Sequence, residues 1–532
     1  MRNQFLIFSV FALLAVCLLG IWVSPHWFWL FVLIVPFVLG GVYDMTQTHH
    51  AIARNFPVLG RLRYVAEWLR PKLFQYFVES DINGRPFNRI DRSIIYQRAK
   101  NVVDTTPFGT QLDLYAEGYE WMNHSINALD KKNLNHDPRV MIGGPQCLQP
   151  YSMSVLNVSA MSFGSLSKNA ILALNGGAKS GSFAHNTGEG GISPYHLSPG
   201  GDLIYQVGTG YFGCRADDGG FDPNAFRETV APANVKMIEL KLSQGAKPGH
   251  GGILPAAKNT PEIAAIRKVQ PGVTVDSPPF HRAFHTPDGL LQLLKQMRDL
   301  ADGRPVGFKL CVGNKHEFVA ICKAIISTGI YPDFITVDGG EGGTGAAPVE
   351  FSNYVGMPFR EAVVFVHNAL VGFGLRKHIR VIASGHVVSG FDIFRAHALG
   401  ADACNSARAM MFAIGCIQAL ECNLNTCPTG VATQDESLSK GLVPGEKAVR
   451  VASFHRKTVE SFVELMAGAG YDQANKINRR SISRRILMNQ VKRYDEIYPY
   501  LPEGCLLDLA SAPDDWRELI QMSRADSFSL VD

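Results

Sequence analysis

The stretch VIASGHVVSGFDIFRAHALGADACNSAR, residues 381–408, contains a complete strand–loop–helix–strand unit. The apolar run 381–383 predicts a short buried strand, and the Gly- and Ser-rich loop after it leads into a helix predicted over 390–399. A second apolar run, 401–405, predicts the next strand. Because two strands joined through a helix lie parallel in one sheet, this unit favours an α/β fold.

The same alternation extends over the middle of the chain. Candidate strands lie at 155–160, 180–185, 235–242, 273–276, 306–312, 334–337, 381–383 and 401–405. Helical patterns lie between several of them, at 261–269, 288–301, 315–328, 359–374 and 390–399. Eight units over roughly 300 residues predict a TIM-like (β/α)8 barrel, with a doubly wound sheet as the competing architecture. The site is expected at the carboxyl ends of the strands.

Composition excludes several classes of protein. The chain has 532 residues, of which 18% are charged and 46% apolar, and its formal net charge is +4. The apolar share excludes wholesale disorder, and a nearly neutral chain offers no concentrated basic face for nucleic acid. The G-x-G-x-x-G match at 208–213 precedes CRADDGGFDPN, which is typical of turns rather than of a helix. We therefore expect no pyridine-nucleotide site there.

A long stretch near the start lacks charged residues. After Arg2, the next charged residue is Asp44. Two apolar runs, 5–23 and 27–43, are separated by the short break Ser24-Pro25-His26. Since a helix needs about 20 apolar residues to cross a bilayer, a two-helix transmembrane hairpin is predicted. A cleaved signal peptide and a buried soluble hairpin are the alternatives.

Basic residues flank this hairpin on both sides. One precedes it and five follow it: Arg2, then Arg54, Arg61, Arg63, Arg70 and Lys72. The positive-inside rule predicts that both ends of the hairpin face the cytoplasm, so we expect an inner-membrane protein with a cytoplasmic barrel. The 10 Cys would then be free thiols or metal ligands. The expected organisation is a transmembrane hairpin at 1–44, a juxtamembrane lead-in at 45–139, the barrel at 140–470 and a basic tail at 471–532.

Three cysteines are clustered late in the barrel region. The segment GCIQALECNLNTCPTGVATQ places Cys416, Cys422 and Cys427 within 12 residues, at C-x5-C-x4-C spacing. Three thiolates from one loop suit an iron–sulfur cluster, and three ligands rather than four indicate [3Fe-4S]. A zinc site lacking its fourth ligand and purely structural thiols are the alternatives. Cys404 could be a fourth ligand, although its predicted strand would bury it.

The cysteine segment resembles the cluster loop of the glutamate synthase family. Six other segments resemble that family's flavin and 2-oxoglutarate barrel in the same order: AMSFGSLSKNA (160–170), NTGEGG (186–191), ELKLSQGAKPGHGG (239–252), SPPFH (277–281), EGGTGAAP (341–348) and SGHVVSGFDIFRAHALGADA (384–403). The resemblance covers about residues 140–470. It implies FMN, a [3Fe-4S] cluster and reductive amination of 2-oxoglutarate by ammonia to L-glutamate. That reaction belongs to an oxidoreductase acting on CH–NH2 donors. The electrons would come from an external donor such as ferredoxin or a reductase.

The two last strand ends suit a flavin phosphate. A phosphate needs backbone N–H donors, a helix N-terminus and little steric bulk. The seventh strand is followed by Ser384, Gly385 and Gly390, and the eighth by Ser406 and Arg408, whose guanidinium could pair with phosphate. Tight turns alone are the alternative explanation for these glycines.

Other strand ends suit the flavin ring. Lys309, at the end of the fifth predicted strand, is the candidate cation beside N1 of reduced flavin, and a solvated lysine is the alternative. By resemblance, Met161 and Ser162 pack against the ring. The loop containing Gly342, Gly343 and Thr344 would let the backbone approach it closely.

The substrate would be met by Glu189, Lys241 and Gln244. Lys241 and Gln244, with Lys247 nearby, follow what we interpret as the third strand and match family positions near flavin and substrate. Glu189 resembles a family glutamate where ammonia meets substrate, with a role in proton handling or ammonium positioning. A turn carboxylate accepting backbone hydrogen bonds is the alternative for Glu189.

The sequence also departs from the family. His250 replaces the usual Glu in GAKPGHGG, the glutaminase domain of full glutamate synthases and their C-terminal β-helical domain are not matched, and 476–493 holds seven Lys/Arg. That basic segment could contact anionic lipid or an acidic electron carrier, or could be a solvated helix face. Because the glutaminase domain is not matched, glutamine hydrolysis is not expected. An N-methylglutamate synthase-like enzyme, a 2-hydroxy-acid flavin dehydrogenase and a non-catalytic membrane redox subunit remain alternatives.

Overall fold

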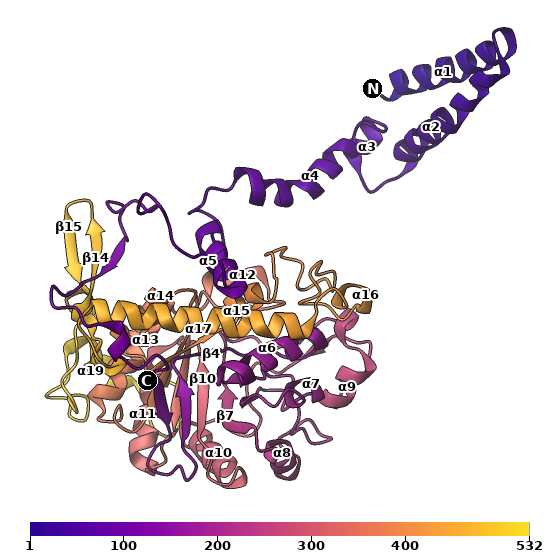
Figure 1. The fold of residues 1–532 in the computed structure, drawn as a ribbon. Helices are drawn as coiled ribbons and strands as arrows, with labels where there is room; N and C mark the ends of the chain where they lie inside the picture. The colour runs from indigo at the N-terminus through magenta and orange to yellow at the C-terminus, as the bar shows by residue number, and fades with distance from the viewer. Residues whose placement is uncertain (531–532) are drawn as a thin grey trace. The chain divides into compact units, whose positions relative to one another are not determined.

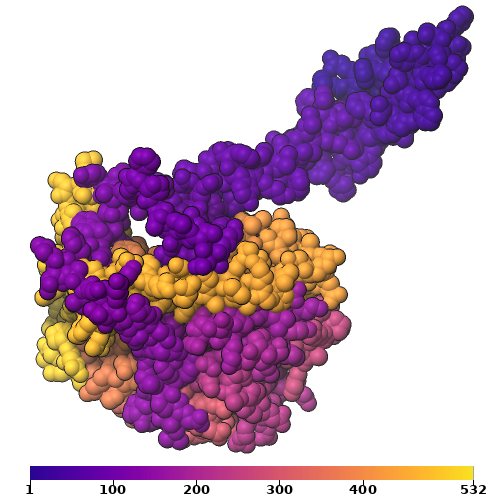
Figure 2. Space-filling model, viewed as in Figure 1, coloured from indigo at the N-terminus to yellow at the C-terminus, as the bar shows by residue number. Residues whose placement is uncertain are grey.

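The computed structural model describes residues 1–530 and divides the chain into two compact units, residues 1–89 and residues from Ile90 onward (Figures 1 and 2). Within its described residues the first unit is helical, whereas the second contains the strands. Each unit has its own packing, so each is described separately.

The first unit begins with two long apolar helices. Its elements are α1 (Arg2–Trp22), η1 (Pro25–Leu30), α2 (Phe31–Thr46), α3 (Ala51–Asn55), α4 (Arg61–Leu73) and η2 (Phe74–Val78). The segments Arg2–Trp22 and Pro25–Thr46 are long and apolar enough to span a membrane. Length and composition are weak evidence for a membrane span, because a signal sequence has the same length and composition. The transmembrane hairpin therefore stays a prediction.

The second unit is built around a closed barrel of eight parallel strands, which confirms the (β/α)8 fold. In barrel order the strands are β4 (Leu156–Val158), β5 (His185–Asn186), β6 (Leu203–Val207), β7 (Val235–Lys241), β10 (Val306–Leu310), β11 (Phe334–Asp338), β12 (Arg380–Ser384) and β13 (Ala403–Ser406). The register brings Lys309 on β10 beside Lys241 on β7, so the strand ends of the predicted site are neighbours.

Two of the predicted strands need correction. The true third strand is β6, which was not predicted. The run 273–276 instead contributes β9 (Val275–Asp276), which pairs antiparallel with β8 (Ile253–Leu254) outside the barrel. Of the run 180–185, the first two residues end α6 (Lys168–Gly181), the next three connect it to the strand, and β5 begins only at His185. The loop carrying Lys241 therefore follows the fourth barrel strand, not the third.

The helices agree more closely with the sequence pattern, because caps define their ends. Those at 315–328 and 390–399 are found as α11 (Lys315–Thr328) and α14 (Gly390–Leu399), the latter begun by a Ser389–Asp392 capping box. The other three predicted helices are α9 (Pro261–Arg267), α10 (Pro287–Leu300) and α13 (Phe359–Gly372). The remaining helices of four or more residues from residue 89 onward are α5 (Arg89–Lys100), α7 (Pro194–Leu197), α8 (Pro223–Val230), α12 (Val349–Tyr354), α15 (Arg408–Ala413), α16 (Glu436–Ser439), α17 (Pro444–Gly468), α18 (Tyr494–Ile497) and α19 (Asp514–Met522).

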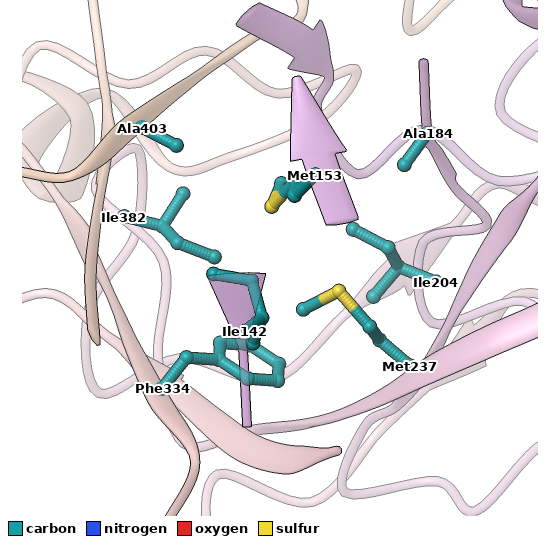
Figure 3. Close-up of a cluster of buried hydrophobic side chains, with 8 residues drawn as sticks. All are labelled: Ile142, Met153, Ala184, Ile204, Met237, Phe334, Ile382 and Ala403. Atoms are coloured by element: carbon teal, nitrogen blue, oxygen red, sulfur yellow. The ribbon is translucent and has the colours of Figure 1, made fainter. Parts of the chain in front are cut away.

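An apolar plug closes the amino-terminal end of the barrel (Figure 3). The antiparallel strands β2 (Arg139–Ile142) and β3 (Tyr151–Ser154) contribute Ile142 and Met153, both fully buried. These two side chains pack with residues at or near strand starts: Ala184, Ile204, Met237, Phe334, Ile382 and Ala403. Because this end is filled, polar chemistry is left to the carboxyl end.

The basic segment 476–493 forms strands and short turns rather than a helix, so the solvated helix face is wrong. It contains β14 (Ile482–Leu487) and β15 (Gln490–Arg493), which form a sheet with β1 (Glu120–Met122). Arg479 is fully buried and donates to the Tyr498 and Pro499 carbonyls at 2.8 and 2.9 Å. Arg484 lies 3.7 Å from Glu120. Several of its cations therefore serve the fold.

Candidate active site at the carboxyl ends of the barrel strands

An ion pair joins the loop after β5 to the end of β7. Lys241 Nζ lies 2.7 Å from Glu189 Oε1, and the two side chains are 7% and 18% exposed. Burial would raise the pKa of Glu189, but the Lys241 ammonium holds it below its ordinary value. Glu189 is therefore a carboxylate held at the barrel mouth by a cation, which contradicts the alternative of a turn carboxylate bonded only to backbone.

Two further cations act on the same carboxylate. Buried Lys247 donates to the Ala346 carbonyl at 2.8 Å, and burial lowers its pKa to about 8. Arg267 on α9 donates to the Phe163 carbonyl at 3.1 Å, and burial lowers its pKa to about 10. Both interact electrostatically with Glu189. Three cations around one carboxylate suit a substrate with more than one negative charge. Arg267 was not predicted, although an arginine on a short apolar helix was a visible signal.

A neutral histidine forms a hydrogen bond with the backbone carbonyl of Lys241. His281 is 3% exposed, and burial lowers its pKa to about 4. Its Nε2 lies 2.8 Å from the Lys241 carbonyl oxygen, which can only accept, so we assign the proton to Nε2. Nδ1 then accepts from the Tyr211 hydroxyl at 3.1 Å. This histidine ends the SPPFH motif, but no role for it was predicted.

Lys309 is a buried cation with a counter-charge. Its Nζ lies 3.2 Å from Asp338 Oδ2 at the end of β11, and Asp338 also accepts from the Gly245 N–H at 2.9 Å. Burial would lower the pKa of Lys309, but Asp338 raises it above its ordinary value. The side chain is not a solvated lysine, so that alternative is wrong. Gln244 is half-buried beside Gly245 in the same loop.

Below these groups, Glu239 links four strands. This buried carboxylate on β7 accepts from Asn186 and Gln206 at 2.8 and 2.6 Å, and from Thr336 at 2.5 Å. The donors come from β5, β6 and β11. This network orders the layer beneath the site, and it was not predicted, because its members are far apart in the sequence.

Among the candidate phosphate residues, two serines form hydrogen bonds at the strand ends, and Gly390 has a packing role. Ser384 and Ser406 end adjacent strands, and their hydroxyls contact Ser159 Oγ at 3.3 Å and the Val387 carbonyl at 2.7 Å. Gly390, by contrast, has a clear packing role, because a Cβ there would lie 2.5 Å from the Phe462 nitrogen on α17.

The remaining phosphate candidates are also engaged by neighbours. A Cβ on Gly385 would lie 2.8 Å from the Phe359 ring. Arg408 donates to the Glu341 carbonyl, which ties the loop after β13 to the glycine-rich loop after β11. Gly385 and Arg408 thus shape this end of the barrel whether or not a phosphate binds.

The candidate ring residues lie in loops that approach one another closely. Gly188 has φ +64°, and a Cβ there would lie 2.7 Å from the Ser162 nitrogen, beside Met161. Across the mouth, a Cβ on Gly343 would lie 2.7 Å from Arg408 Cδ, and one on Gly342 would lie 3.2 Å from Gly245 Cα. Thr344 donates to the Ala346 carbonyl at 3.4 Å. Glycine is required at Gly188, where two backbones meet, whereas Gly343 faces the flexible side chain of Arg408.

The cysteine loop holds its three thiols within electrostatic range of one another. Burial raises the pKa of Cys416 to about 12 and raises that of Cys422. Burial would also raise the pKa of Cys427, but the Thr429 hydroxyl and the backbone N–H groups of Ala432, Thr429 and Val431 lower it. Hydrogen bonds to sulfur are what a thiolate ligand needs. These hydrogen bonds favour the thiolate form of Cys427, the form in which a cysteine binds iron.

Within residues 1–530, no group of three or more His, Cys, Asp or Glu is arranged to hold a single metal ion. In a cluster, each cysteine binds a different iron atom, so its thiolates stand farther apart than those around one ion. This finding supports neither the alternative of a mononuclear zinc site nor the predicted [3Fe-4S] cluster.

Direct contacts tie the cysteine loop to the loop after β4. Gln434 Nε2 donates to the Gly164 and Leu166 carbonyls at 2.9 and 2.8 Å, and Ser167 Oγ donates to the Gly430 carbonyl at 2.7 Å. Buried Lys258 bridges the same two loops. Its Nζ donates to the Ser165 carbonyl at 3.0 Å and to the Ala432 carbonyl at 2.8 Å.

Lys258 also interacts electrostatically with Cys422 and Cys427. The segment that follows Cys427 is thus held against the loop that carries Met161 and Ser162. This contact brings the candidate cluster loop next to a candidate flavin loop.

The fold and the site define a parallel (β/α)8 protein with a cationic mouth and a cysteine loop beside it. The family model described as the conserved region in glutamate synthase matches residues 101–472, so the chain belongs to the glutamate synthase family. Among its relatives is the glutamate synthase large subunit-like protein YerD of Bacillus subtilis strain 168. It is 36% identical over 482 residues, 82% of this chain and 91% of that protein.

Other relatives share only the central region. The archaeal glutamate synthase [NADPH] of Methanocaldococcus jannaschii is 36% identical over 315 residues, 59% of this chain and 58% of that protein. The archaeal-type glutamate synthase [NADPH] of Thermotoga neapolitana is 34% identical over 313 residues, with the same two shares. A solved structure of a mandelate oxidase variant with 2-hydroxy-phenylacetamide has a TM-score of 0.41 and 15% identity, covering 81% of this chain and 96% of that one.

Proposed function

We propose that this protein is an FMN and [3Fe-4S] oxidoreductase that reductively aminates 2-oxoglutarate with ammonia to give L-glutamate. The single observation that carries the proposal is the Lys241–Glu189 pair at the barrel mouth, with Lys247 and Arg267 acting on the same carboxylate. Membership of the glutamate synthase family supports the same chemistry. When bound, FMN would supply hydride transfer and the cluster single-electron transfer.

The protein's own residues would bind and orient the substrates. Lys247 and Arg267 would pair with the carboxylates of 2-oxoglutarate, and Gln244 would donate to it. Glu189 would hold ammonium and accept the proton that ammonium gives up before it attacks; ammonia and the ketone would then condense to 2-iminoglutarate and water. Lys241 would keep Glu189 ionised until substrate arrives, and Lys309 would offset negative charge at flavin N1.

The cysteine loop would supply the electron entry point. Cys416, Cys422 and Cys427 would each bind one iron, and the N–H donors around Cys427 would stabilise its thiolate. The Gln434 and Lys258 contacts would keep the cluster close to the flavin. An external donor such as ferredoxin or a reductase would deliver the electrons.

The anchor is part of the same proposal. The two apolar segments would cross the inner membrane as a hairpin, with the basic residues and the barrel on the cytoplasmic side. Accessibility of the barrel to added protease in sealed inverted and right-side-out vesicles tests this. Cleavage confined to inverted vesicles supports the orientation, and cleavage confined to right-side-out vesicles contradicts it.

The activity test is anaerobic purification followed by flavin extraction, EPR spectroscopy and turnover. Chemically reduced protein is offered 2-oxoglutarate with ammonium, and separately with methylamine. Extracted FMN, a three-iron signal and glutamate formed with ammonium support the proposal. N-methylglutamate formed in preference would favour an N-methylglutamate synthase-like enzyme, and absence of flavin and of the iron signal would overturn the cofactor assignment.

A further inference from the structure

The helix α4 has an apolar face with basic residues on both borders. At 3.6 residues per turn, Leu62, Val65, Leu69 and Leu73 fall on one face, and Trp68 lies just beyond the border of that face, next to Arg61 and Lys72. The basic residues Arg61 and Lys72 lie along one border of this face, and Arg63 and Arg70 lie along the other. The acidic residue Glu67 lies on the opposite side, 2.7 Å from Arg63.

This apolar face is exposed. None of the 13 residues of α4 is buried, and Leu62 and Trp68 are each 65% exposed. Soluble proteins seldom expose a row of large apolar side chains on one helix unless something covers it. Lys72 Nζ lies 3.7 Å from the Trp68 ring centroid, so a charged group lies beside an apolar ring. Tryptophan is enriched at membrane interfaces, where apolar and polar surroundings meet.

The side of α4 that carries Tyr64, together with Arg61 on the border of the apolar face, is fixed to the rest of its unit. The Tyr64 ring lies 4.5 Å from the His50 ring, just before α3. Arg61 forms an ion pair with Asp44 at 2.8 Å, and Asp44 also accepts from the Val58 N–H at 2.9 Å. Asp44 lies near the end of α2, the second candidate span. The start of α4 is therefore attached where that apolar segment ends, with its apolar face turned away from α3.

We propose that α4 binds the surface of a bilayer that contains anionic phospholipid, with its apolar face among the acyl chains and its basic borders at the headgroups. Long basic side chains at the borders of an apolar face suit this position, because their stems stay in the apolar region while their charges reach the phosphates. A protein partner would not require cations on both borders. This inference rests in part on the proposed membrane anchor, since α4 starts where α2 ends.

The test uses the full chain reconstituted in vesicles of phosphatidylglycerol and phosphatidylcholine with brominated acyl chains, which quench tryptophan. The Trp68 contribution is the fluorescence difference between the wild type and Trp68→Phe. We expect bromolipid to quench this contribution at least twofold, and less when phosphatidylglycerol is omitted. Leu69→Lys should abolish the quenching, whereas Glu67→Lys, which adds the same side chain on the opposite face, should retain it.

The remaining tryptophans separate the two proposals. Five tryptophans remain in Trp68→Phe. Quenching that persists there, and that is lost when Trp22, Trp27 and Trp29 are also changed to Phe, reports the hairpin rather than Trp121 or Trp516. If the hairpin tryptophans are quenched but Trp68 is not, the inference about α4 is overturned and the anchor stands. If Trp68 alone is quenched, the anchor fails and the lipid contact of α4 stands. If neither bromolipid nor aqueous acrylamide quenches Trp68, a protein surface covers it. If acrylamide alone quenches Trp68, the side chain is exposed to water. Either result overturns the inference.

Discussion

Lys241 Nζ lies 2.7 Å from Glu189 Oε1, although β6 stands between the strands that carry the two residues into the site. The pair therefore connects two loops that are not neighbours around the barrel. Because His281 holds the Lys241 carbonyl and Arg267 acts on Glu189, the position of each partner is defined independently of the other. A preorganised pair of this kind suits a site that must receive a charged substrate.

Removal of the Glu189 charge should affect both catalysis and acid stability. In Glu189→Gln we expect glutamate formation by chemically reduced protein to fall about 100-fold or more, because a positioned proton acceptor is lost. The folded pKa of Glu189 lies below its ordinary value of 4.5, so its contribution to stability is present above that value and is lost as pH falls through the folded pKa. Denaturant unfolding should therefore show a wild-type advantage at neutral pH that shrinks in acid. A constant difference across this range would contradict the assignment.

Removal of the Lys309 charge should shift the midpoint potential of the flavin without releasing the flavin from the protein. In Lys309→Met, loss of the cation should disfavour the reduced, negatively charged flavin and lower its midpoint potential by about 30 mV or more. For a two-electron couple this shift changes the equilibrium constant for reduction about tenfold. Potentiometric titration with optical detection measures this. Lys268→Met, on the outer end of α9, is the matched control and should leave the potential unchanged. An equal shift in both variants would show that Lys309 does not act on the flavin.

Cysteine substitutions should separate cluster ligands from other thiols. Cys422→Ser should lose the three-iron EPR signal and most of the bound iron, because serine is a poor ligand for this cluster. Cys147→Ser, which alters a half-buried thiol outside the loop, should retain both. Normal iron content in Cys422→Ser would refute the ligand assignment.

The amino-terminal end of the barrel should be sensitive to a buried ion pair. Arg298 lies 3.0 Å from Asp333, and the two side chains are 4% and 0% exposed. Arg298→Met would leave the Asp333 charge buried and unpaired, which should cost about 3–5 kcal/mol of unfolding free energy. Urea unfolding followed by circular dichroism measures the loss. Arg376→Met, which breaks the more exposed pair with Asp402, should cost less.

Local sequence signals predicted much of this fold. The helix at 315–328 was predicted with its observed bounds, because an apolar period of 3.6 ends at Gly329, whose φ of +67° closes the helix. The loops after β12 and β13 were recognised from Gly and Ser at their strand ends. The strand β6 was missed because Tyr205 and Gln206 interrupt its apolar run. Gln206 becomes compatible with a buried strand only through its hydrogen bond to Glu239.

The sequence by itself determined the α/β class, the cysteine loop and the order of the site motifs, because periodicity, spacing and loop chemistry are local properties of the chain. Only the tertiary structure decided that Lys241 meets Glu189, that Arg267 and His281 join them, and that Lys258 bridges the cysteine loop to the loop after β4. These contacts depend on how the barrel closes. Closure fixes which strand ends become neighbours, and the missed β6 moved Lys241 from the end of the third strand to the end of the fourth.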